Sequence, residues 1–313
     1  MEGIVRAVCI SKNRGTEKED VKTAGFIENY GIEGDAHAGD WHRQVSLLSY
    51  DKVEEFNRKG GNAVPGTFGE NLLVEGIDFR SLPAGTLFRC GEVVLKLTQI
   101  GKECHSHCNI FKQVGDCIMP REGVFARVIK GGVISCGDTM TVEFPAEDAA
   151  LTAAVITLSD KGSRGERVDT SGPRAVSMLE AAGYEIIETL ILPDEQALIQ
   201  KELIRLSDRR QVNLIVTTGG TGFSERDCTP EATLAVATRN APGIAEAIRY
   251  ESMKITSRAM LGRGASVIRN RTLIVNLPGS EKAVEESLQA VIPSITHGIG
   301  ILTGTEKECG RKL

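Results

Sequence analysis

The stretch "VNLIVTTGGTGFSERDCTPEAT", residues 212–233, decides how the C-terminal half of this chain folds. Its beginning, "VNLIVT", is a mainly apolar run of the kind that forms a buried strand in a parallel sheet. Three glycines and several hydroxyl and charged residues follow at once. Thr229-Pro230-Glu231 is then a typical helix start, because proline is favoured in the first helical turn. A strand, a glycine-rich loop and a helix in this order predict a βα unit.

The same order of strand, loop and helix repeats on both sides of this stretch. Further buried strands are expected at 152–159, 184–193 and 271–279. The helical segments that accompany the strands are expected at 172–183, 194–208, 229–238 and 280–299. Such an alternation predicts an α/β fold in which helices cover both faces of a parallel sheet.

Residues 1–145 show a different pattern of expected secondary structure. Short apolar segments are separated by turns that contain Gly-Asp or Gly-Glu, and they lie at 3–11, 45–50, 85–91 and 92–100. Regular short strands of this type predict a closed or sandwiched β-structure, with one helix at 50–60. Pro145 and the acidic, alanine-rich run after it separate the two patterns. We therefore expect two domains, 1–145 and 151–313, joined by a linker.

The charge and composition of the chain exclude several classes of partner. The 313 residues are 41% hydrophobic and 25% charged and carry a net charge of -5, so we expect neither nucleic acid nor a membrane as a partner. The first residues lack the apolar core of a signal peptide, and no stretch has the roughly 20 apolar residues of a membrane helix. The eight cysteines are therefore interpreted as reduced thiols of a cytoplasmic protein.

Three of the expected strands run into unusual loops. In a parallel sheet the carboxyl ends of the strands share one edge, where ligands gather. Gly219, Gly220 and Gly222 let the backbone approach a ligand closely, and free N–H groups of such a loop bind phosphate. The alternative is a tight βα turn without a ligand. Arg226 and Asp227 add a cation and a carboxylate beside the same turn.

A second carboxylate follows another strand. Asp194 in "LPDEQ" precedes a helical run, where it serves either as an N-cap or as a site residue. Two carboxylates beside a phosphate-binding loop suggest Mg²⁺ and a phosphoryl or nucleotidyl transfer. The P-loop pattern GxxxxGK is absent from the sequence, which argues against ordinary kinases and GTPases.

Several segments together resemble the MogA/MoaB family, which includes molybdopterin adenylyltransferases and the gephyrin G domain. Besides the stretch at 217–233, they are "SDKGSRGERVDTSGPRAV", "LILPDEQ", "NAPGIAEAIR", "SVIRNRTLIVNLPGS" and "HGI", and all lie within 151–305. The resemblance implies a three-layer α/β fold, a mostly parallel sheet and a homotrimer. It further implies transfer of AMP from ATP to the terminal phosphate of molybdopterin with release of pyrophosphate. The product later receives molybdate or tungstate.

The resemblance also assigns roles to matching positions. It implies that Asp194 and Asp227 hold Mg²⁺ and take part in catalysis, with Glu231 as a further contact at the helix start. Arg226 is expected to offset the repulsion between phosphates. The residues implied to hold phosphate or to line the same pocket are Ser171, Gly172, Pro173, Gly219, Gly220, Thr221, Gly222, Pro278, Gly279 and Ser280.

The N-terminal half resembles the MOSC domain, a β-rich module of molybdenum cofactor sulfurases. The similar segments lie within 1–143 and are "GIEGDAHAGDWHRQVSLLS", "PGTFGENLLVEGID" and "GTLFRCGEVVLKLTQIGKECHSHC". The resemblance implies a β-barrel in which Cys104 occupies the place of the persulfide-carrying or cofactor-binding thiol. This chain has Gly-Lys-Glu-Cys where the family often has Arg-x-Pro-Cys.

The segment "CHSHC" at 104–108 admits three interpretations. Cys104, His105, His107 and Cys108 are soft-metal ligands that would suit Zn²⁺, although their spacing differs from the usual knuckle. Alternatively, neighbouring cationic groups lower the pKa of Cys104 and make it a reactive thiol. The third interpretation is ordinary core or surface placement.

These observations give two hypotheses for the whole chain. The first is a bifunctional enzyme of molybdenum or tungsten cofactor biosynthesis. Its C-terminal half would adenylylate molybdopterin, its N-terminal half would bind the pterin or carry sulfur, and it would work with other cofactor-biosynthesis proteins. The second is a non-catalytic molybdopterin-binding or scaffold protein with a metal-binding N-terminal domain. The presence of both Asp194 and Asp227 beside the glycine loop favours the first.

Overall fold

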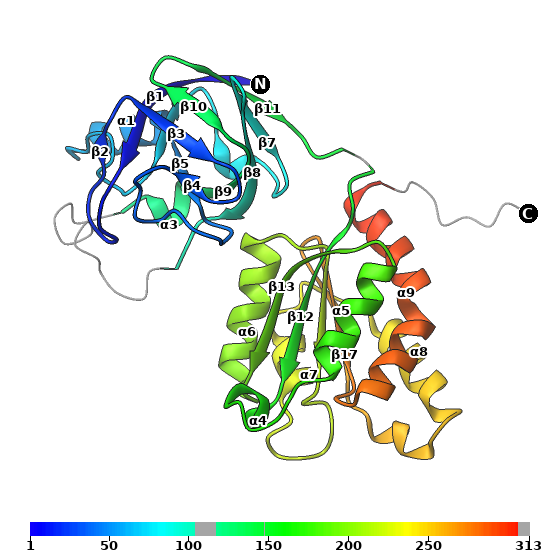
Figure 1. Cartoon of the computed structure of the whole chain (residues 1–313). Helices are drawn as coiled ribbons and strands as arrows, with labels where there is room; N and C mark the ends of the chain where they lie inside the picture. Colours follow the sequence, from blue (N-terminus) through cyan, green and yellow to red (C-terminus); the bar gives the residue numbers. More distant parts are fainter. Residues whose placement is uncertain (104–116, 147, 306–313) are drawn as a thin grey trace, which may run out of the picture. The chain divides into compact units, whose positions relative to one another are not determined.

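The computed structural model describes residues 1–103, 117–146 and 148–305 (Figure 1). The chain divides into two compact units, Met1–Ala146 and Glu147–Leu313. Each unit has its own hydrophobic core, and each is described separately. The cysteine and histidine cluster at 104–108 lies outside the described residues. In the ranges that are described, no helix is long and apolar enough to cross a membrane.

The N-terminal domain is a closed β-barrel. Its described strands follow the order β11-β7-β8-β9-β5-β6-β1, and β1 pairs again with β11 through Glu2–Thr141 and Ile4–Thr139. The seven strands are β1 (Glu2–Ile10), β5 (Val45–Ser49), β6 (Leu72–Glu75), β7 (Leu87–Cys90), β8 (Val93–Ile100), β9 (Val124–Lys130) and β11 (Thr139–Glu143). Of the closed or sandwiched β-structure that the strand pattern predicts, the structure has the closed form, the barrel that the MOSC resemblance implies.

Smaller elements cover the ends and one side of the barrel. β2 (Glu19–Asp20) extends the barrel sheet at β1, and β10 (Gly132–Ser135), β3 (Thr23–Ile27) and β4 (Gly31–Ile32) form a separate small sheet. The predicted helix at 50–60 is α1 (Tyr50–Arg58). The other short helical elements of the described part are η1 (Phe79–Ser81) and α3 (Met119–Glu122).

Two polar signatures of the N-terminal half have structural roles. Glu70 of "FGEN" is fully buried and accepts hydrogen bonds from the amides of Gly66 (2.6 Å) and Phe68 (3.1 Å). Its burial raises the pKa of this carboxyl to about 7. Asp35 of "GIEGD" forms a buried ion pair with Lys18 and accepts a hydrogen bond from the Ser11 amide at 3.1 Å. The buried carboxylates of Glu70 and Asp35 therefore hold the loops around them in place through hydrogen bonds and an ion pair.

The C-terminal domain contains a mostly parallel sheet. Its strand order is β13-β12-β14-β17-β16-β15, and the first four strands run parallel. They are β13 (Glu185–Leu192), β12 (Thr152–Leu158), β14 (Leu214–Thr218) and β17 (Thr272–Leu277). An antiparallel edge of β16 (Ser266–Arg269) and β15 (Arg239–Asn240) was not predicted, because these strands are short and partly polar.

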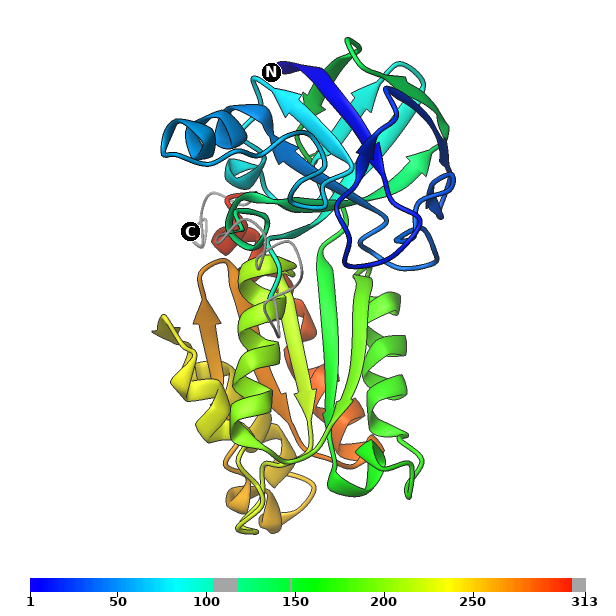
Figure 2. The same ribbon diagram turned by 90° about the vertical axis from the view of Figure 1, so that its left-hand side faces the viewer.

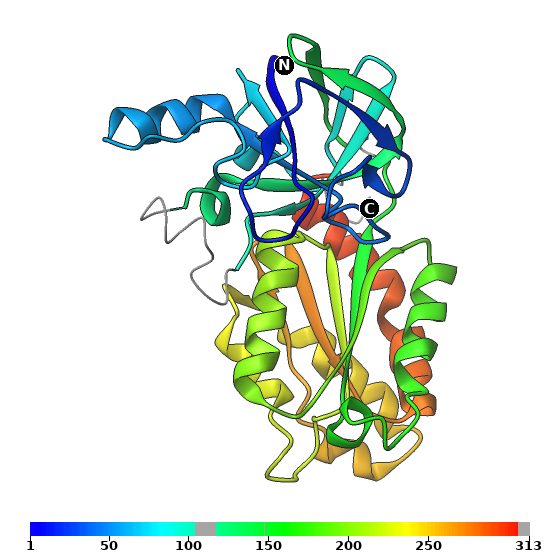
Figure 3. The same ribbon diagram turned by 60° about the vertical axis from the view of Figure 1, so that its left-hand side comes forward.

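Helices cover both faces of this sheet, as predicted. Along β12, Ala153 and Val155 pack on one face, whereas Ala154 and Ile156 pack on the other. The first face carries α5 (Ser171–Ala181), α8 (Pro242–Met253) and α9 (Glu281–Thr303), and the second carries α6 (Gln196–Ile204) and α7 (Thr229–Ala235). Figures 2 and 3 show α6 on the opposite side of the sheet from α9. The arrangement has three layers.

Candidate active site

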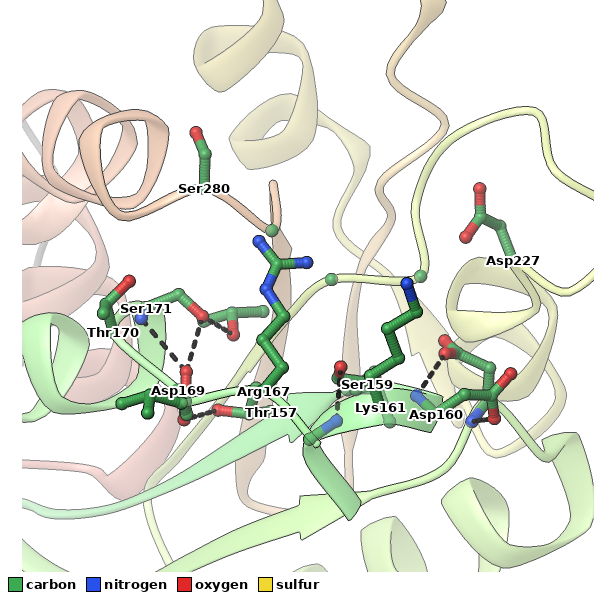
Figure 4. Close-up of a pocket in the computed structure, with 18 residues that line it drawn as sticks. Thr157, Ser159, Asp160, Lys161, Arg167, Asp169, Thr170, Ser171, Asp227 and Ser280 are labelled. Carbon is green, nitrogen blue, oxygen red and sulfur yellow. Dashed lines mark hydrogen bonds between the residues drawn. The ribbon is translucent and has the colours of Figure 1, made fainter. Parts of the chain in front are cut away.

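A cavity of about 440 Å³ lies at the carboxyl ends of β12, β14 and β17 (Figure 4). The loops after these strands supply its walls, together with Asp194 beyond β13. The lining residues are Thr157, Leu158, Ser159, Asp160, Lys161, Gly162, Arg167, Val168, Asp169, Thr170, Ser171, Asp194, Thr218, Gly219, Gly220, Asp227, Gly279 and Ser280. Because the strands are parallel, residues far apart in the sequence meet at this one edge.

Gly219 and Gly220, the first two glycines of the loop after β14, have no room for a side chain because neighbouring atoms lie too close to the backbone. Gly219 has φ +94°, and a Cβ there would lie 2.4 Å from the carbonyl oxygen of Leu158. Gly220 has φ +63°, and its Cβ would lie 2.7 Å from Oδ1 of Asp194. The Gly219 amide donates to the Leu277 carbonyl at 3.2 Å, so it is engaged by the protein. The Gly220 amide makes no hydrogen bond with another described residue, and Gly220 lines the cavity.

The second half of the same loop is held by an arginine that sequence reasoning missed. Arg263 donates from Nε to the Gly222 carbonyl (2.6 Å) and from Nη2 to the Asp227 carbonyl (2.5 Å). It also forms an ion pair with Glu231. Burial opposes ionisation of Glu231, yet the Arg263 guanidinium lowers the pKa of that carboxyl. Thr221, Gly222 and Glu231 therefore belong to this clamp and do not line the cavity.

Removal of the Arg263 side chain should loosen the loop that carries Asp227. We expect Arg263→Met to lower the free energy of unfolding by about 1–3 kcal/mol, because charged hydrogen bonds to two carbonyls are lost. Chemical denaturation followed by circular dichroism measures this change. Arg258→Met is the control, because Arg258 is exposed in η3 (Ser257–Leu261). Equal stability of the two variants would contradict the clamp.

Carboxylates gather at one side of the cavity. The Asp160 amide donates to Oδ2 of Asp194 (3.2 Å), and the Asp194 amide donates to Oδ1 of Asp160 (3.1 Å). Arg226 donates to both oxygens of Asp160, at 2.8 and 3.0 Å. The guanidinium holds the pKa of Asp160 below its ordinary value. Arg226, predicted to face phosphate, is thus engaged by a carboxylate and lies outside the cavity lining.

Asp194 has one oxygen that the protein leaves unsatisfied. Its Oδ1 is buried and has no hydrogen-bond partner among the residues that the structure describes. Burial raises the pKa of this carboxyl, and the negative charges of Asp160 and Asp227 raise it further. A buried, unpartnered carboxylate oxygen is costly unless a cation or donor approaches it. These residues therefore fit a divalent cation.

The carboxylates do not complete a metal site alone. Within the described ranges, no group of three or more His, Cys, Asp or Glu residues is placed to hold a metal ion. Mg²⁺ is commonly bound by one or two carboxylates, with substrate phosphates and water as its other ligands. A magnesium ion held by Asp194 and Asp227 would accordingly need phosphate oxygens in the same cavity.

The Asp169 carboxylate accepts hydrogen bonds from the free amides at the N-terminal end of α5. Its Oδ1 accepts hydrogen bonds from the amides of Ser171 and Gly172, both at 3.0 Å, and its Oδ2 accepts from the Thr157 hydroxyl at 2.6 Å. Ser171 also contacts the Thr218 hydroxyl at 2.9 Å. The helix end is thus already occupied by an anion, and Gly172 and Pro173 do not line the cavity.

The loop after β17 contributes the opposite wall. Gly279 and Ser280 line the cavity, whereas Pro278 does not. Gly279 lies close to the glycine loop, because a Cβ there would be 3.2 Å from Cα of Gly219. The Ser280 hydroxyl accepts a hydrogen bond from the Ala283 amide at 3.3 Å and caps α9.

Comparison with known proteins decides the family of this fold and site. The model of a probable molybdopterin binding domain matches residues 154–297, and that of the MOSC domain matches 34–141. Molybdopterin adenylyltransferase of Helicobacter pylori is 39% identical over 160 residues, which cover 50% of this chain and 91% of that protein. The Escherichia coli enzyme is 40% identical over 156 residues, covering 48% and 80%.

The C-terminal domain belongs to the molybdopterin adenylyltransferase family. Among solved structures, the molybdopterin biosynthesis enzyme MoaB of Thermus thermophilus is 43% identical, with a TM-score of 0.48 and coverage of 49% of this chain and 97% of that chain. Both resemblances inferred from the sequence, to the MogA/MoaB family and to the MOSC domain, are confirmed.

The adenylyltransferase domain brings half of its predicted site residues together in the cavity. Asp194, Asp227 and Gly220 share the cavity with Ser171 and Ser280. The residues that sequence reasoning missed are Asp160, Lys161, Arg167, Asp169 and Arg263. Asp160, Lys161, Arg167 and Asp169 lie in the loop after β12. The sequence shows that this loop is unusual, but no glycine or proline at these four positions indicates that their side chains face a ligand. Arg263 contacts residues that are 32 or more positions away in the sequence, and such long-range contacts leave no periodic pattern.

The described cysteines of the N-terminal domain give little support to thiol chemistry. Burial raises the pKa of Cys90 to about 11 and raises that of Cys9 even more strongly. Cys117 is buried, and the Cys136 thiol contacts the Arg6 carbonyl at 3.1 Å. Cys104, His105, His107 and Cys108 lie outside the described residues, so their predicted roles stay predictions.

Proposed function

We propose that the C-terminal domain transfers AMP from ATP to the terminal phosphate of molybdopterin and thereby acts in molybdenum or tungsten cofactor biosynthesis. A phosphate oxygen of molybdopterin attacks the α-phosphorus of ATP and forms a new P–O–P bridge. The bond between the α- and β-phosphates breaks, and its electron pair leaves with pyrophosphate. The observation that carries this proposal is the buried Oδ1 of Asp194, which has no hydrogen-bond partner among the described residues and lies beside Gly220 of the glycine loop.

The residues of the cavity have separable roles in this reaction. Asp194 and Asp227 would hold Mg²⁺, which when bound offsets the negative charge of the phosphates. The Gly220 amide donates to a phosphate oxygen, and the Gly279-Ser280 turn at the start of α9 offers further amides. Asp160 and Arg226 fix the loop that carries Asp227 against the end of β12. The Asp169 network keeps α5 in place behind the substrates.

Product analysis tests the proposal directly. The purified chain is incubated with ATP, Mg²⁺ and molybdopterin, and released pyrophosphate and adenylylated pterin are measured. We expect both products with the natural chain and neither above background with Asp227→Ala. Glu225→Ala is the control, because this neighbouring acid does not line the cavity. Absence of pyrophosphate release from the natural chain would refute the assignment and favour a non-catalytic binding protein.

The raised pKa of Asp194 predicts how activity depends on pH. The protonated carboxyl cannot hold Mg²⁺, and protonation begins at a higher pH than for an ordinary aspartate. The kcat/KM for AMP transfer should therefore fall early on acidification, and additional Mg²⁺ should move this fall to lower pH. Asp160→Asn removes one neighbouring charge and frees Arg226, so it should also move the fall to lower pH.

A matched variant controls for general charge effects on this profile. Glu166→Gln removes an exposed acid of the same loop that pairs with Arg164 at 2.8 Å. It should leave the acidic limb of the profile where the natural chain has it. An acidic limb that Asp160→Asn and added Mg²⁺ both leave unmoved would show that Asp194 does not govern it.

For the MOSC domain we propose that it binds the pterin or carries sulfur on Cys104. The proposal draws on the domain match and on its fusion to an adenylyltransferase domain. Incubation of the full chain with a persulfide donor, which passes its terminal sulfur to a thiol and leaves as a thiol itself, should give a persulfide that mass spectrometry detects. Cys104→Ala should abolish this persulfide, and Cys108→Ala should retain it. Stoichiometric zinc in the purified chain without any persulfide would favour the metal-binding alternative.

A further inference from the structure

Two cations line the cavity without a partner. Lys161, in the short helix α4 (Asp160–Ser163), and Arg167, in the loop between α4 and α5, both belong to the cavity wall. In the part of the chain that the structure describes, neither side chain forms an ion pair or a hydrogen bond. Figure 4 shows the Lys161 ammonium and the Arg167 guanidinium pointing away from β12 toward the open part of the cavity.

The other charged groups of this loop are already engaged. Arg164 donates to both oxygens of Glu166, at 2.8 and 3.0 Å, and neither residue lines the cavity. Asp160 is held by Arg226, and Asp169 accepts the amides at the start of α5. Asp160 and Asp169, the two acids of this loop in the cavity wall, are therefore bound by groups other than Lys161 and Arg167. The positive charge of these two side chains remains available to a ligand.

We propose that Lys161 and Arg167 form a phosphate-binding subsite that works without the metal, an inference that rests on the proposed function of the same cavity. A guanidinium and an ammonium bind phosphate oxygens through charge-assisted hydrogen bonds. The Gly279-Ser280 turn opens α9, whose 23 residues direct a positive dipole end at the same space. Substrate phosphate would thus be bound in two ways: by the side chains of Lys161 and Arg167, and by a Mg²⁺ ion held on Asp194 and Asp227.

Phosphate binding by Lys161 and Arg167 can be measured separately from metal-dependent binding. Binding in the presence of EDTA reports Lys161, Arg167 and the backbone amides without the metal, because Asp194 and Asp227 then have no cation and repel an anion. We expect Lys161→Met/Arg167→Met to weaken binding of pyrophosphate in EDTA by about tenfold or more, as measured by isothermal titration calorimetry. Arg164→Met is the matched control, since it removes a cation of the same loop that pairs with Glu166, and it should bind as the natural chain does.

The choice of probe identifies which phosphate the subsite takes. ATP and pyrophosphate stand for the nucleotide chain, and inorganic phosphate stands for a phosphomonoester such as that of the pterin. Weakened binding of ATP and pyrophosphate assigns the subsite to the nucleotide, and weakened binding of inorganic phosphate alone assigns it to the pterin. Affinities within about twofold of the natural chain for all three probes would overturn the inference.

The same titrations separate this inference from the proposed function. If the double variant binds ATP, pyrophosphate and inorganic phosphate normally in EDTA while the natural chain still releases pyrophosphate from ATP, the subsite is refuted and the enzymatic function stands. If the natural chain neither binds Mg-ATP nor transfers AMP, the proposed function is refuted. The subsite then stands or falls on metal-free binding of the inorganic anions alone. Circular dichroism should be unchanged, because both side chains are exposed.

Discussion

Asp194→Asn should lower kcat/KM for AMP transfer by roughly a hundredfold to a thousandfold, which is the usual cost of removing one electrostatic contact to a transition state. Asparagine retains an oxygen that can accept the Asp160 amide, so the link between the ends of β12 and β13 is preserved. It loses the negative charge whose Oδ1 is unpartnered in the cavity. The loss should therefore fall on metal-dependent binding and catalysis.

The stability of the same variant distinguishes a functional role from a structural one. The pKa of Asp194 is raised in the folded protein, so the ionised carboxyl disfavours the fold at neutral pH. Its replacement by a neutral amide should leave the unfolding midpoint unchanged or raise it. Glu195→Gln, at the exposed next position, should change neither stability nor activity. A strongly destabilised Asp194→Asn with normal activity per folded molecule would contradict our assignment.

Gly219→Ala should destabilise the C-terminal domain by about 3 kcal/mol or more and abolish activity. Two effects add at this position. The residue has φ +94°, which L-residues resist, and the new Cβ would lie 2.4 Å from the backbone oxygen of Leu158. Leu158 ends β12 and cannot move without disturbing the cavity floor. The measurement is chemical denaturation followed by circular dichroism, together with the pyrophosphate assay.

Gly165→Ala provides the matched control for this substitution. Gly165 has φ +73°, but a Cβ there would meet no atom within 4 Å. Only the backbone preference is lost, so we expect about 1 kcal/mol of destabilisation. Similar losses in the two variants would show that conformational strain, and not the contact with Leu158, explains the glycine at 219.

The central part of the fold was predictable because its signals are local. β12, β14 and β17 are apolar on both faces, which is the pattern of strands covered by helices on both sides. The edge strands β15 and β16 were missed because two to four partly polar residues carry no period. Barrel closure between β1 and β11 depends on pairing across the whole domain, which no local pattern contains.

The site was predictable where its chemistry is concentrated in one motif. Gly220 and Asp227 lie within ten residues of each other, the segment "LPDEQ" after another strand added Asp194, and the family resemblance added Ser280. The role expected for Arg226 differs from its observed contact with Asp160, because two loops must fold before that pair can form. The charged residues of the loop after β12 could not be ranked by sequence. Only their partners distinguish Arg164, which is paired, from Arg167, which is not.

The pairing of the first barrel strand with the last has a consequence for synthesis of the chain. On one edge of β1, residues Glu2 to Ile4 pair with Thr139 to Thr141 of β11. Until about 140 residues have left the ribosome, the edge of β1 that faces β11 has no neighbour and can recruit a strand from another nascent chain. Such late closure makes the N-terminal domain slow to fold. The adenylyltransferase domain, translated afterwards, builds its sheet from shorter βα steps.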